Sequence, residues 1–173
     1  MTKAPVFSVL TPADCAKFLA RNHVGRLAFR NAETVDIEPL GYVADGGWLF
    51  MRSSYGAKLE AIAHSPYVAF EVDEIKGPFD WQSVVVHGTI YLLPADGAPI
   101  EQRQFRRAVM ALQSAMPGAF TQADPVPERQ IVYGLHIDRL DGRMAQSRPG
   151  KTPRRARATS KPALKRRRAP DGF

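Results

Sequence analysis

The alternation of apolar and polar residues predicts a chain built mostly of β-strands. The strand candidates are short segments rich in β-branched residues and bounded by turn residues. They comprise residues 24–29, 35–44, 48–52, 67–73, 83–93 and 131–140. Most connections are too short for parallel crossovers, so the pattern favours a mainly antiparallel barrel with peripheral helices over a doubly wound sheet.

Two longer helices interrupt the strands. Thr11 is placed to cap the first, with Pro12 at its first position and Asp14 in its first turn, and we expect it to run to about Asn22. Cys15, the only cysteine, lies on the apolar stripe of that helix, which predicts a buried, inert thiol. The second helix spans residues 99–116, where apolar residues recur with the 3.6-residue period.

Glycine and proline mark the turns and irregularities. Asp45-Gly46-Gly47 predicts a hairpin turn, 76–78 a loop, and Asp141-Gly142 a turn that ends the last strand. Pro39 predicts an edge position or a bulge in its strand, because proline cannot donate to a ladder. Gly88 predicts a bulge or a close backbone approach.

The segment 48–58 (WLFMRSSYGAK) carries the clearest candidate chemistry. A strand delivers Arg52, Ser53 and Ser54 to a turn, and a short helix then begins near Ala57, with Lys58 in its first turn. The start of a helix attracts anions, and an Arg fork with a Lys charge beside it would complete a cradle for one phosphate. The residues alone fit equally well a charged strand end followed by a solvated helical turn.

Charge divides the 173-residue chain into a domain and a tail. Of 24 basic and 17 acidic residues, ten and one respectively lie after residue 147, so the tail carries +9 and the remainder −2. We expect residues 1–146 to form one domain and residues 147–173 a disordered basic tail. One interpretation of the tail is non-specific contact with nucleic acid or an anionic membrane. The alternative for the tail is a solubilising extension without a specific partner.

Several classes of protein are not expected. No run approaches the roughly 20 apolar residues of a membrane span, and the first residues lack the apolar region of a signal peptide. One cysteine allows no internal disulfide and no cysteine-based zinc site, and no other metal motif is present. These features predict a cytoplasmic protein.

The order of the motifs resembles the pyridoxamine 5′-phosphate oxidase-like FMN-binding split barrels, and most of all the short flavin-binding proteins grouped with nitroimidazole-resistance reductases. The resemblance covers residues 10–145. It rests on five segments in the order of the family: Val24-Gly25-Arg26-Leu27-Ala28, Ile37-Glu38-Pro39-Leu40-Gly41-Tyr42, Phe50-Met51-Arg52-Ser53 with Gly56-x-Lys58, Val68-Ala69-Phe70-Glu71-Val72-Asp73, and Trp81-Gln82-Ser83-Val84-Val85-Val86-x-Gly88.

The resemblance implies an antiparallel split β-barrel that forms a homodimer and binds two FMN molecules at the subunit interface. It assigns the phosphate to Arg52 and Lys58, assisted by Ser53 and Ser54. It places the isoalloxazine ring against the strand 37–42, with a further strand on the other side of the pocket. The candidate contacts on these two strands are Ile37, Glu38, Pro39 and Tyr42 on the first and Trp81, Ser83 and Val84 on the second.

The resemblance further implies an FMN-dependent oxidoreductase that passes hydride from a reduced nicotinamide to a small electrophilic acceptor. The cofactor carries that chemistry, and the sequence contains no residue pair that must act as acid and base. The alternative is a non-catalytic split-barrel dimer that binds flavin, the deazaflavin F420 or haem and contacts nucleic acid through its tail. Vitamin B6 oxidation is not expected, because the basic tail replaces the family's C-terminal substrate-phosphate residues.

Overall fold

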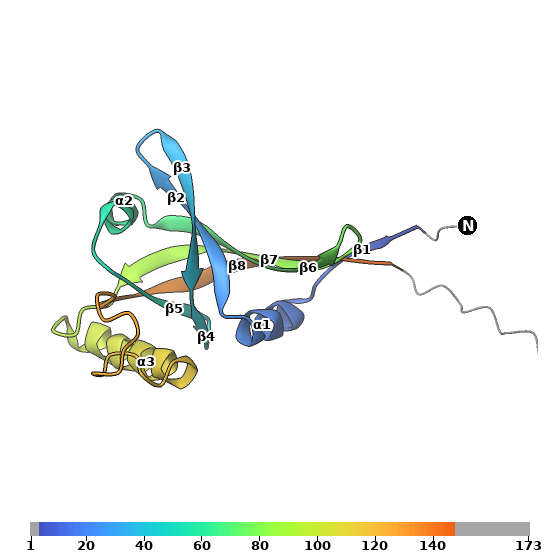
Figure 1. The fold of residues 1–173 in the computed structure, drawn as a ribbon. Coiled ribbons are helices and arrows are strands. Elements are labelled where there is room, and N and C mark those ends of the chain that lie inside the picture. Colours follow the sequence, from blue (N-terminus) through green and yellow to red (C-terminus); the bar gives the residue numbers. More distant parts are fainter. Residues whose placement is uncertain (1–3, 148–173) are drawn as a thin grey trace, which may run out of the picture.

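The computed structural model describes residues 4–147, which form one eight-stranded antiparallel sheet and three helices (Figure 1). The prediction of a mainly antiparallel β fold with peripheral helices is confirmed. The predicted tail, 147–173, lies almost wholly outside the described residues. The strands are β1 (Val6–Val9), β2 (Val24–Asn31), β3 (Thr34–Gly41), β4 (Val43–Asp45), β5 (Trp48–Ser53), β6 (Tyr67–Gly77), β7 (Asp80–Leu92) and β8 (Ile131–Gln146). The helices are α1 (Pro12–Arg21), α2 (Ala57–His64) and α3 (Pro99–Ala115).

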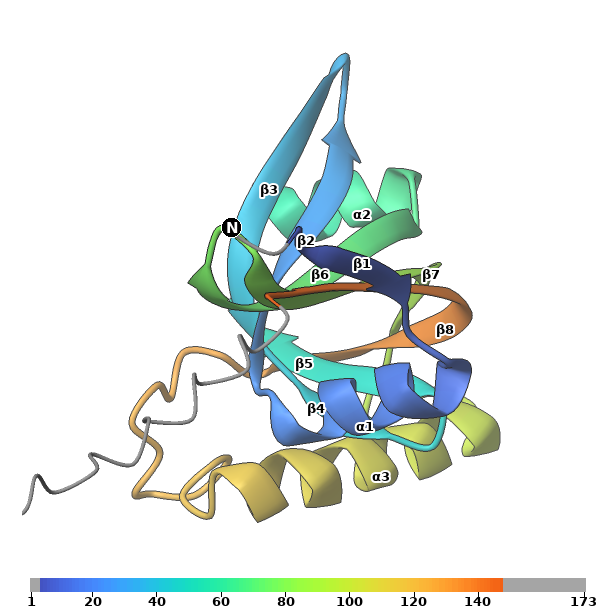
Figure 2. The same ribbon diagram turned by 90° about the vertical axis from the view of Figure 1, so that its right-hand side faces the viewer.

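The strands follow the order β3-β2-β6-β7-β8-β5-β4, with β1 added to β8. In the view of Figure 2, α2 lies above the curled sheet and α1 and α3 lie below it. The buried residues of α1 and α2 join one apolar cluster, and those of α3 join another. The hairpin turn between β4 and β5 is confirmed, because Gly46 and Gly47 adopt φ values of 51° and 85°, which suit glycine. Pro39 lies on β3 at the end of the sheet order, so the predicted edge position is also confirmed.

The last strand is longer than the sequence predicts. β8 continues through Asp141 and Gly142, which pair with Val85 and Val84 of β7, so the predicted turn there is wrong. Pairing with β7, together with the Leu10 N–H that donates to the Gly142 carbonyl at 2.9 Å, keeps these two residues extended despite their turn propensity. The predicted loop at 76–78 is also shorter than expected, since β6 runs to Gly77.

Strand β1 has no counterpart among the sequence predictions. Its four residues are all exposed and show no alternation of buried and exposed positions. It is held by pairing with the end of β8, from Val6 opposite Gln146 to Val9 opposite Arg143. Tertiary pairing, rather than a local pattern, therefore makes this segment a strand.

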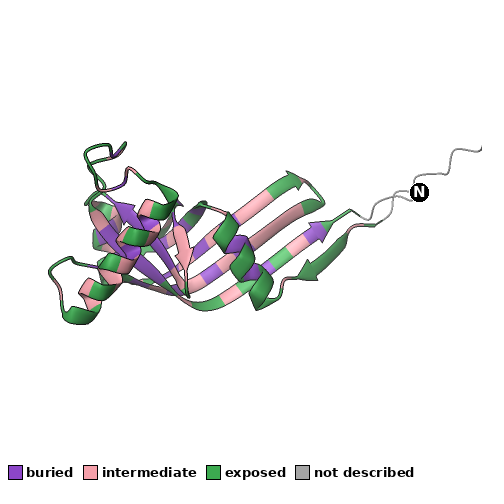
Figure 3. Ribbon diagram, turned by 90° about the horizontal axis from the view of Figure 1, so that it is seen from below, coloured by how far each residue is buried: buried purple, intermediate pink, exposed green. Residues whose placement is uncertain are grey.

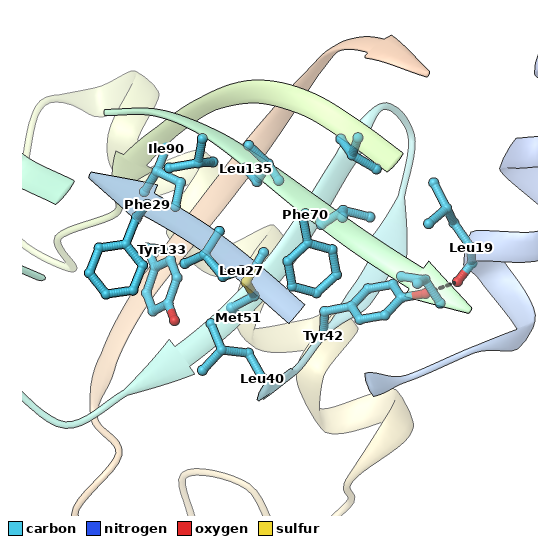
Figure 4. Close-up of a cluster of buried hydrophobic side chains, with 14 of the residues drawn as sticks. Leu19, Leu27, Phe29, Leu40, Tyr42, Met51, Phe70, Ile90, Tyr133 and Leu135 are labelled. Atoms are coloured by element: carbon cyan, nitrogen blue, oxygen red, sulfur yellow. Dashed lines mark hydrogen bonds between the residues drawn. The ribbon is translucent and has the colours of Figure 1, made fainter. Parts of the chain in front are cut away.

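The core consists of two apolar clusters on opposite faces of β5 and β8. The larger fills the curled sheet and contains Leu27, Phe70, Met51 and Tyr133 (Figure 4). The smaller contains Phe50 and lies under α3. A strand alternates its side chains between faces, so neighbouring residues of β5 enter different clusters.

The helices end and begin largely as predicted. In α1, the Asp14 N–H donates to Thr11 Oγ1 at 3.2 Å, and Cys15 is buried. The apolar stripe of α3 packs on β4, β5 and β8, with Leu112 and Ala108 buried. Within residues 4–147, no helix combines the length and the apolar character that crossing a membrane requires.

One end of the sheet extends beyond the core as an arm. It consists of β1, the β6–β7 hairpin and the end of β8 (Figures 1 and 3). Phe7, Ile75 and Phe79 are 62%, 71% and 48% exposed there. Within one protomer, apolar side chains of β1 and of the β6–β7 hairpin are therefore left exposed.

Gly88→Ala is expected to destabilise the fold. The register of β7 and β8 shifts between His87 and Gly88, which confirms the predicted irregularity, and a Cβ at Gly88 would overlap the His136 carbonyl oxygen. Forcing an atom into such a packed position lowers the free energy of unfolding by about 1–3 kcal/mol. Urea denaturation of both proteins measures the loss.

Gly77→Ala is the matched control, because nothing lies within 4 Å of its added Cβ. We expect a change within about 0.5 kcal/mol there. Equal effects of the two substitutions would contradict the close approach at Gly88.

Candidate functional site

The end of β5 and the start of α2 meet at one corner of the sheet beside β3. Ser53 is the last residue of β5, and α2 begins at Ala57 after Gly56, which provides no capping side chain. The N–H groups of Ala57 and Lys58 find no acceptor within residues 4–147. A helix start with unshared N–H groups is suited to an anion.

Lys58 lies between this helix start and the edge strand. Its Nζ donates to Glu38 Oε2 of β3 at 3.0 Å. The Lys58 side chain is only 13% exposed, whereas the Glu38 side chain is 44% exposed. The cation is thus held at the α2 start by a carboxylate that can turn toward solvent.

Arg52 lies on the outer face of β5, opposite to the face that carries Met51, and forms a buried ion pair. Its Nη1 and Nη2 donate to Asp124 Oδ2 and Oδ1 at 2.5 and 2.8 Å, and the two side chains are 7% and 1% exposed. Nη2 also contacts Met116 Sδ, and the guanidinium lies 4.9 Å from the centre of the Phe120 ring. Both nitrogens of the fork that would grip a phosphate are therefore in use.

Asp124 is held as firmly as its partner. Besides Arg52, its carboxylate accepts the Phe120 N–H at 2.7 Å and the Val126 N–H at 3.0 Å. The hydrogen bond from Arg52 and these two N–H groups hold the pKa of Asp124 well below its usual range. Asp124 thereby fastens the connection between α3 and β8 to the outer face of β5.

The predicted four-residue cradle is only partly assembled. Ser53 is buried and its hydroxyl donates to the Ser54 carbonyl, while Ser54 is exposed. Arg52 and Lys58 flank this dipeptide in sequence but form separate ion pairs. Lys58 and the α2 start remain a one-cation anion site, and Arg52 adds to it only after releasing Asp124.

The predicted ring-binding strand has an open backbone edge. β3 pairs with β2 on one side and ends the sheet order on the other. Ile37 is 65% exposed and Pro39 is exposed, so both face outward. Tyr42 is different: its side chain is buried, and its hydroxyl donates to the Leu19 carbonyl at 2.8 Å (Figure 4).

A pocket of about 190 Å³ adjoins this edge, and sequence reasoning missed it. Tyr42 and Arg52, both predicted site residues, line it together with Leu112 and Met116 of the α3 region and Arg129. The α3 and Arg129 residues come from segments 59 or more positions beyond the end of β5. Their only sequence signal was the apolar stripe of α3, which indicated a core helix.

The hydroxyl of Tyr133 is buried on the inner face of β8 and has no hydrogen-bond partner within the described residues. Tyr133 lies opposite Met51 and is fully buried. Burial is the main reason that its pKa is raised, and the charge of Glu38 adds to the shift. The neutral phenol therefore keeps a free donor for a water molecule or a ligand atom.

The remaining predicted contacts lie far from Lys58 in the same protomer. Ser53 pairs with Ile131 and Trp81 pairs with Ala145, at opposite ends of β8. Fourteen residues of strand separate these positions, on the order of 45 Å along the chain. One protomer cannot bring Lys58 and Trp81 to the same small ligand.

The three residues predicted on β7 also differ in their surroundings. Val84 is buried in the core, whereas Trp81 and Ser83 lie on the other face of the strand. Ser83 Oγ donates to Glu71 Oε1 at 2.9 Å, and Trp81 packs near Phe7 with ring centres 6.3 Å apart. Trp81 and Ser83 can contact a ligand on that face, and the Val84 side chain cannot.

The donor set of the Lys58 corner fits the phosphate of a flavin nucleotide, and Arg52, which donates to Asp124, is not part of that set. Two unshared N–H groups, the Lys58 cation and the open edge of β3 occupy one corner. Bound flavin would supply the redox chemistry, and these residues would hold and orient it. Within residues 4–147, no cluster of three or more His, Cys, Asp or Glu side chains could hold a metal ion.

Asp124→Asn is expected to lower the thermal stability at neutral pH, since it leaves Arg52 buried without a counter-charge. The folded-state pKa of Asp124 lies below the unfolded value, so its contribution is complete above about pH 4 and is lost at lower pH. The difference in melting temperature between wild type and variant should therefore shrink as the pH falls below about 4.

Asp96→Asn serves as control, because Asp96 is exposed and forms no ion pair among the described residues. We expect little change at either pH. If Asp124→Asn melted like the wild type at pH 7, the Arg52–Asp124 pair would not stabilise the fold.

Three solved structures show what this chain is similar to. A FAD-binding protein from Mesorhizobium loti is 27% identical, with a TM-score of 0.64, and the alignment covers 82% of this chain and 99% of the M. loti chain. A candidate 5-nitroimidazole antibiotic resistance protein from Bacteroides thetaiotaomicron is 13% identical with a TM-score of 0.62, covering 84% and 91%. A haem storage protein from Vibrio cholerae is 12% identical with a TM-score of 0.59, covering 75% and 92%. The last two show the shared split-barrel fold.

Comparison with curated proteins finds no match. The model of one protein family, pyridoxamine 5′-phosphate oxidase, matches residues 11–144. These include all three helices, the Lys58 corner and every strand except β1 and the last two residues of β8. The match spans well over half of the chain and agrees with the fold and with the motifs noted in the sequence. The chain therefore belongs to the pyridoxamine 5′-phosphate oxidase family.

Proposed function

We propose that the protein binds FMN and transfers hydride from a reduced nicotinamide to a small electrophilic acceptor. The observation that carries the proposal is the Lys58 corner, where the Lys58 cation contacts Glu38 of the edge strand β3 at a helix start with two unshared N–H groups. A FAD-binding structural neighbour supports a flavin as the ligand class. The single phosphate of FMN matches a corner with one available cation.

The residues of this corner would bind and orient, and the flavin would supply the redox chemistry. Lys58 and the α2 start hold a phosphate, and the backbone edge of β3 lies within reach of a flat polar ring. Exposed Ile37 offers an apolar contact beside that edge. None of these roles requires a side chain to exchange protons.

We further propose that the site is completed by a second copy of the chain. Lys58 and Trp81 lie too far apart along β8 to share a ligand within one protomer. The arm exposes Phe7 and Ile75, and β3 exposes Ile37, so apolar surface is available at both parts of the site. A symmetric dimer would use both surfaces twice and form two equal sites.

The first experiment is an absorption spectrum of the purified full chain before and after addition of FMN. Flavin bands that survive desalting, and bleach on addition of a reduced nicotinamide, support the proposal. A Soret band without flavin bands would instead favour haem, the ligand of the haem storage neighbour. Bound flavin that reduced nicotinamides do not bleach would favour a binding protein over a reductase.

Lys58→Gln is expected to weaken FMN binding at least about tenfold, because a charge-assisted contact contributes roughly 1.5–3 kcal/mol. Glu38→Gln should act in the opposite direction, since it removes the carboxylate that competes for Lys58. Titration by flavin fluorescence quenching measures both. Lys17→Gln, at an exposed position of α1, is the control and should bind FMN as the wild type does.

The opposite changes in FMN affinity expected for Lys58→Gln and Glu38→Gln distinguish a phosphate site from a purely structural ion pair. If Lys58 and Glu38 served only to hold β3 against α2, both substitutions would alter stability alike and leave the affinity for FMN unchanged. That outcome would remove the phosphate site.

Mixing two defective variants tests the shared site. Lys58→Gln and Trp81→Ala should each retain little FMN, whereas a randomised mixture should recover about a quarter of the wild-type sites, since half of the dimers are mixed and each mixed dimer has one intact site. Light scattering should give twice the 19.1 kDa chain mass. No recovery in a mixture shown to contain mixed dimers would place Lys58 and Trp81 in separate roles.

A further inference from the structure

The pocket beside the Arg52–Asp124 pair has a buried floor and a charged rim, and we call it the Arg129 pocket. Tyr42, Arg52 and Leu112 form the buried floor. Arg129, His23 and Met116 are exposed at the rim. Five parts of the chain meet here: the α1–β2 connection, the β3–β4 junction, β5, the end of α3 and the segment before β8.

Its size suits a small molecule. A volume of about 190 Å³ equals roughly six water molecules and lies below the usual range of drug-sized sites. Most of the wall is apolar, from residues such as Leu112, Val43 and Val126. An apolar body of the size of one aromatic ring or a short branched chain would displace poorly bonded water from such a wall.

Two arginines line the pocket, and only one of them is neutralised by a hydrogen-bonded carboxylate. Asp124 accepts hydrogen bonds from both Nη atoms of Arg52, so the charge of Arg52 is neutralised within this ion pair. Glu128 is the only ion-pair partner of Arg129 within residues 4–147, and its Oε1 lies 3.9 Å from Nε, beyond hydrogen-bonding distance. Among the described residues no aspartate or glutamate lines the pocket, so the guanidinium of Arg129 is the charged group available to a ligand.

We infer that the Arg129 pocket binds a small carboxylate with an apolar body. The planar fork of an arginine matches a carboxylate and places it at the rim, while the body of the ligand contacts Leu112 and its neighbours. Inorganic phosphate would gain the charge contact without the apolar one. This binding does not depend on flavin and is measurable in flavin-free protein.

Benzoate is the probe, and benzamide is its neutral counterpart of the same shape. Isothermal titration of the flavin-free full chain should show benzoate binding about fivefold or more tightly than benzamide, since only the carboxylate gains the charge-assisted contact. Isovalerate should compete with benzoate, and inorganic phosphate at the same concentration should not.

Two substitutions locate the site. Arg129→Gln should abolish the preference for benzoate over benzamide, because it removes the charge and keeps a polar side chain on an exposed residue. Arg103→Gln removes the same charge from an exposed position of α3 outside this pocket and should leave the preference intact. Ala115→Phe, at an exposed rim position, should block both compounds.

Three results would overturn the inference: no binding of benzoate or isovalerate, equal binding of benzoate and benzamide, or benzoate binding that survives both Arg129→Gln and Ala115→Phe. Circular dichroism of each variant shows whether it is folded. The flavin titrations of Lys58→Gln use different residues and a different ligand, so this proposal and the flavin proposal can fail separately.

Discussion

The structure depends on the backbone hydrogen bonds of one strand, β8. Along one edge it pairs with nearly the whole of β7, and along the other it carries β5 near its start and β1 near its end. The larger core forms against its inner face and the α3 cluster against its outer face. Gly88 of β7 permits the local shift of register that keeps this long pairing continuous. The positions of the Lys58 corner and of the arm at the two ends of one sheet follow from this shared strand.

The two cations of this region lie on different elements, Arg52 on β5 and Lys58 in the first turn of α2. Arg52 emerges on the outer face, where Asp124, two N–H groups and an aromatic ring surround it. A buried charge is costly unless it is paired and fully hydrogen-bonded, and Asp124 meets both conditions. Lys58 emerges beside an edge strand and a helix start, with a half-exposed carboxylate as its only ion-pair partner within residues 4–147. Arg52 therefore holds the connection between α3 and β8 on β5, whereas Lys58 can exchange Glu38 for a bound anion.

Local chemistry was sufficient to predict most of the elements. The Thr11 cap, the Gly46-Gly47 turn and the period of α3 predicted their elements correctly because each signal acts within a few residues. The β8 strand beyond Leu140 and the whole of β1 were missed, since their conformation comes from pairing across the fold. For the site, the Lys58 corner followed from adjacent residues. Asp124 could not, because it meets Arg52 across 72 positions and its loop composition resembles any polar connection.

The central place of β8 also determines when the protein can fold during synthesis. Val6 pairs with Gln146, 140 residues later, and neither β5 nor β7 has its full complement of neighbours until β8 emerges. Chains are made at roughly 5–20 residues per second, so the strands 24–92 wait for several seconds with apolar faces and unpaired edges exposed. Non-local pairing of this kind is slow and open to aggregation in the meantime. Production of this protein in cells should therefore depend on chaperones that shield nascent strands, and slower growth at reduced temperature should raise the soluble yield.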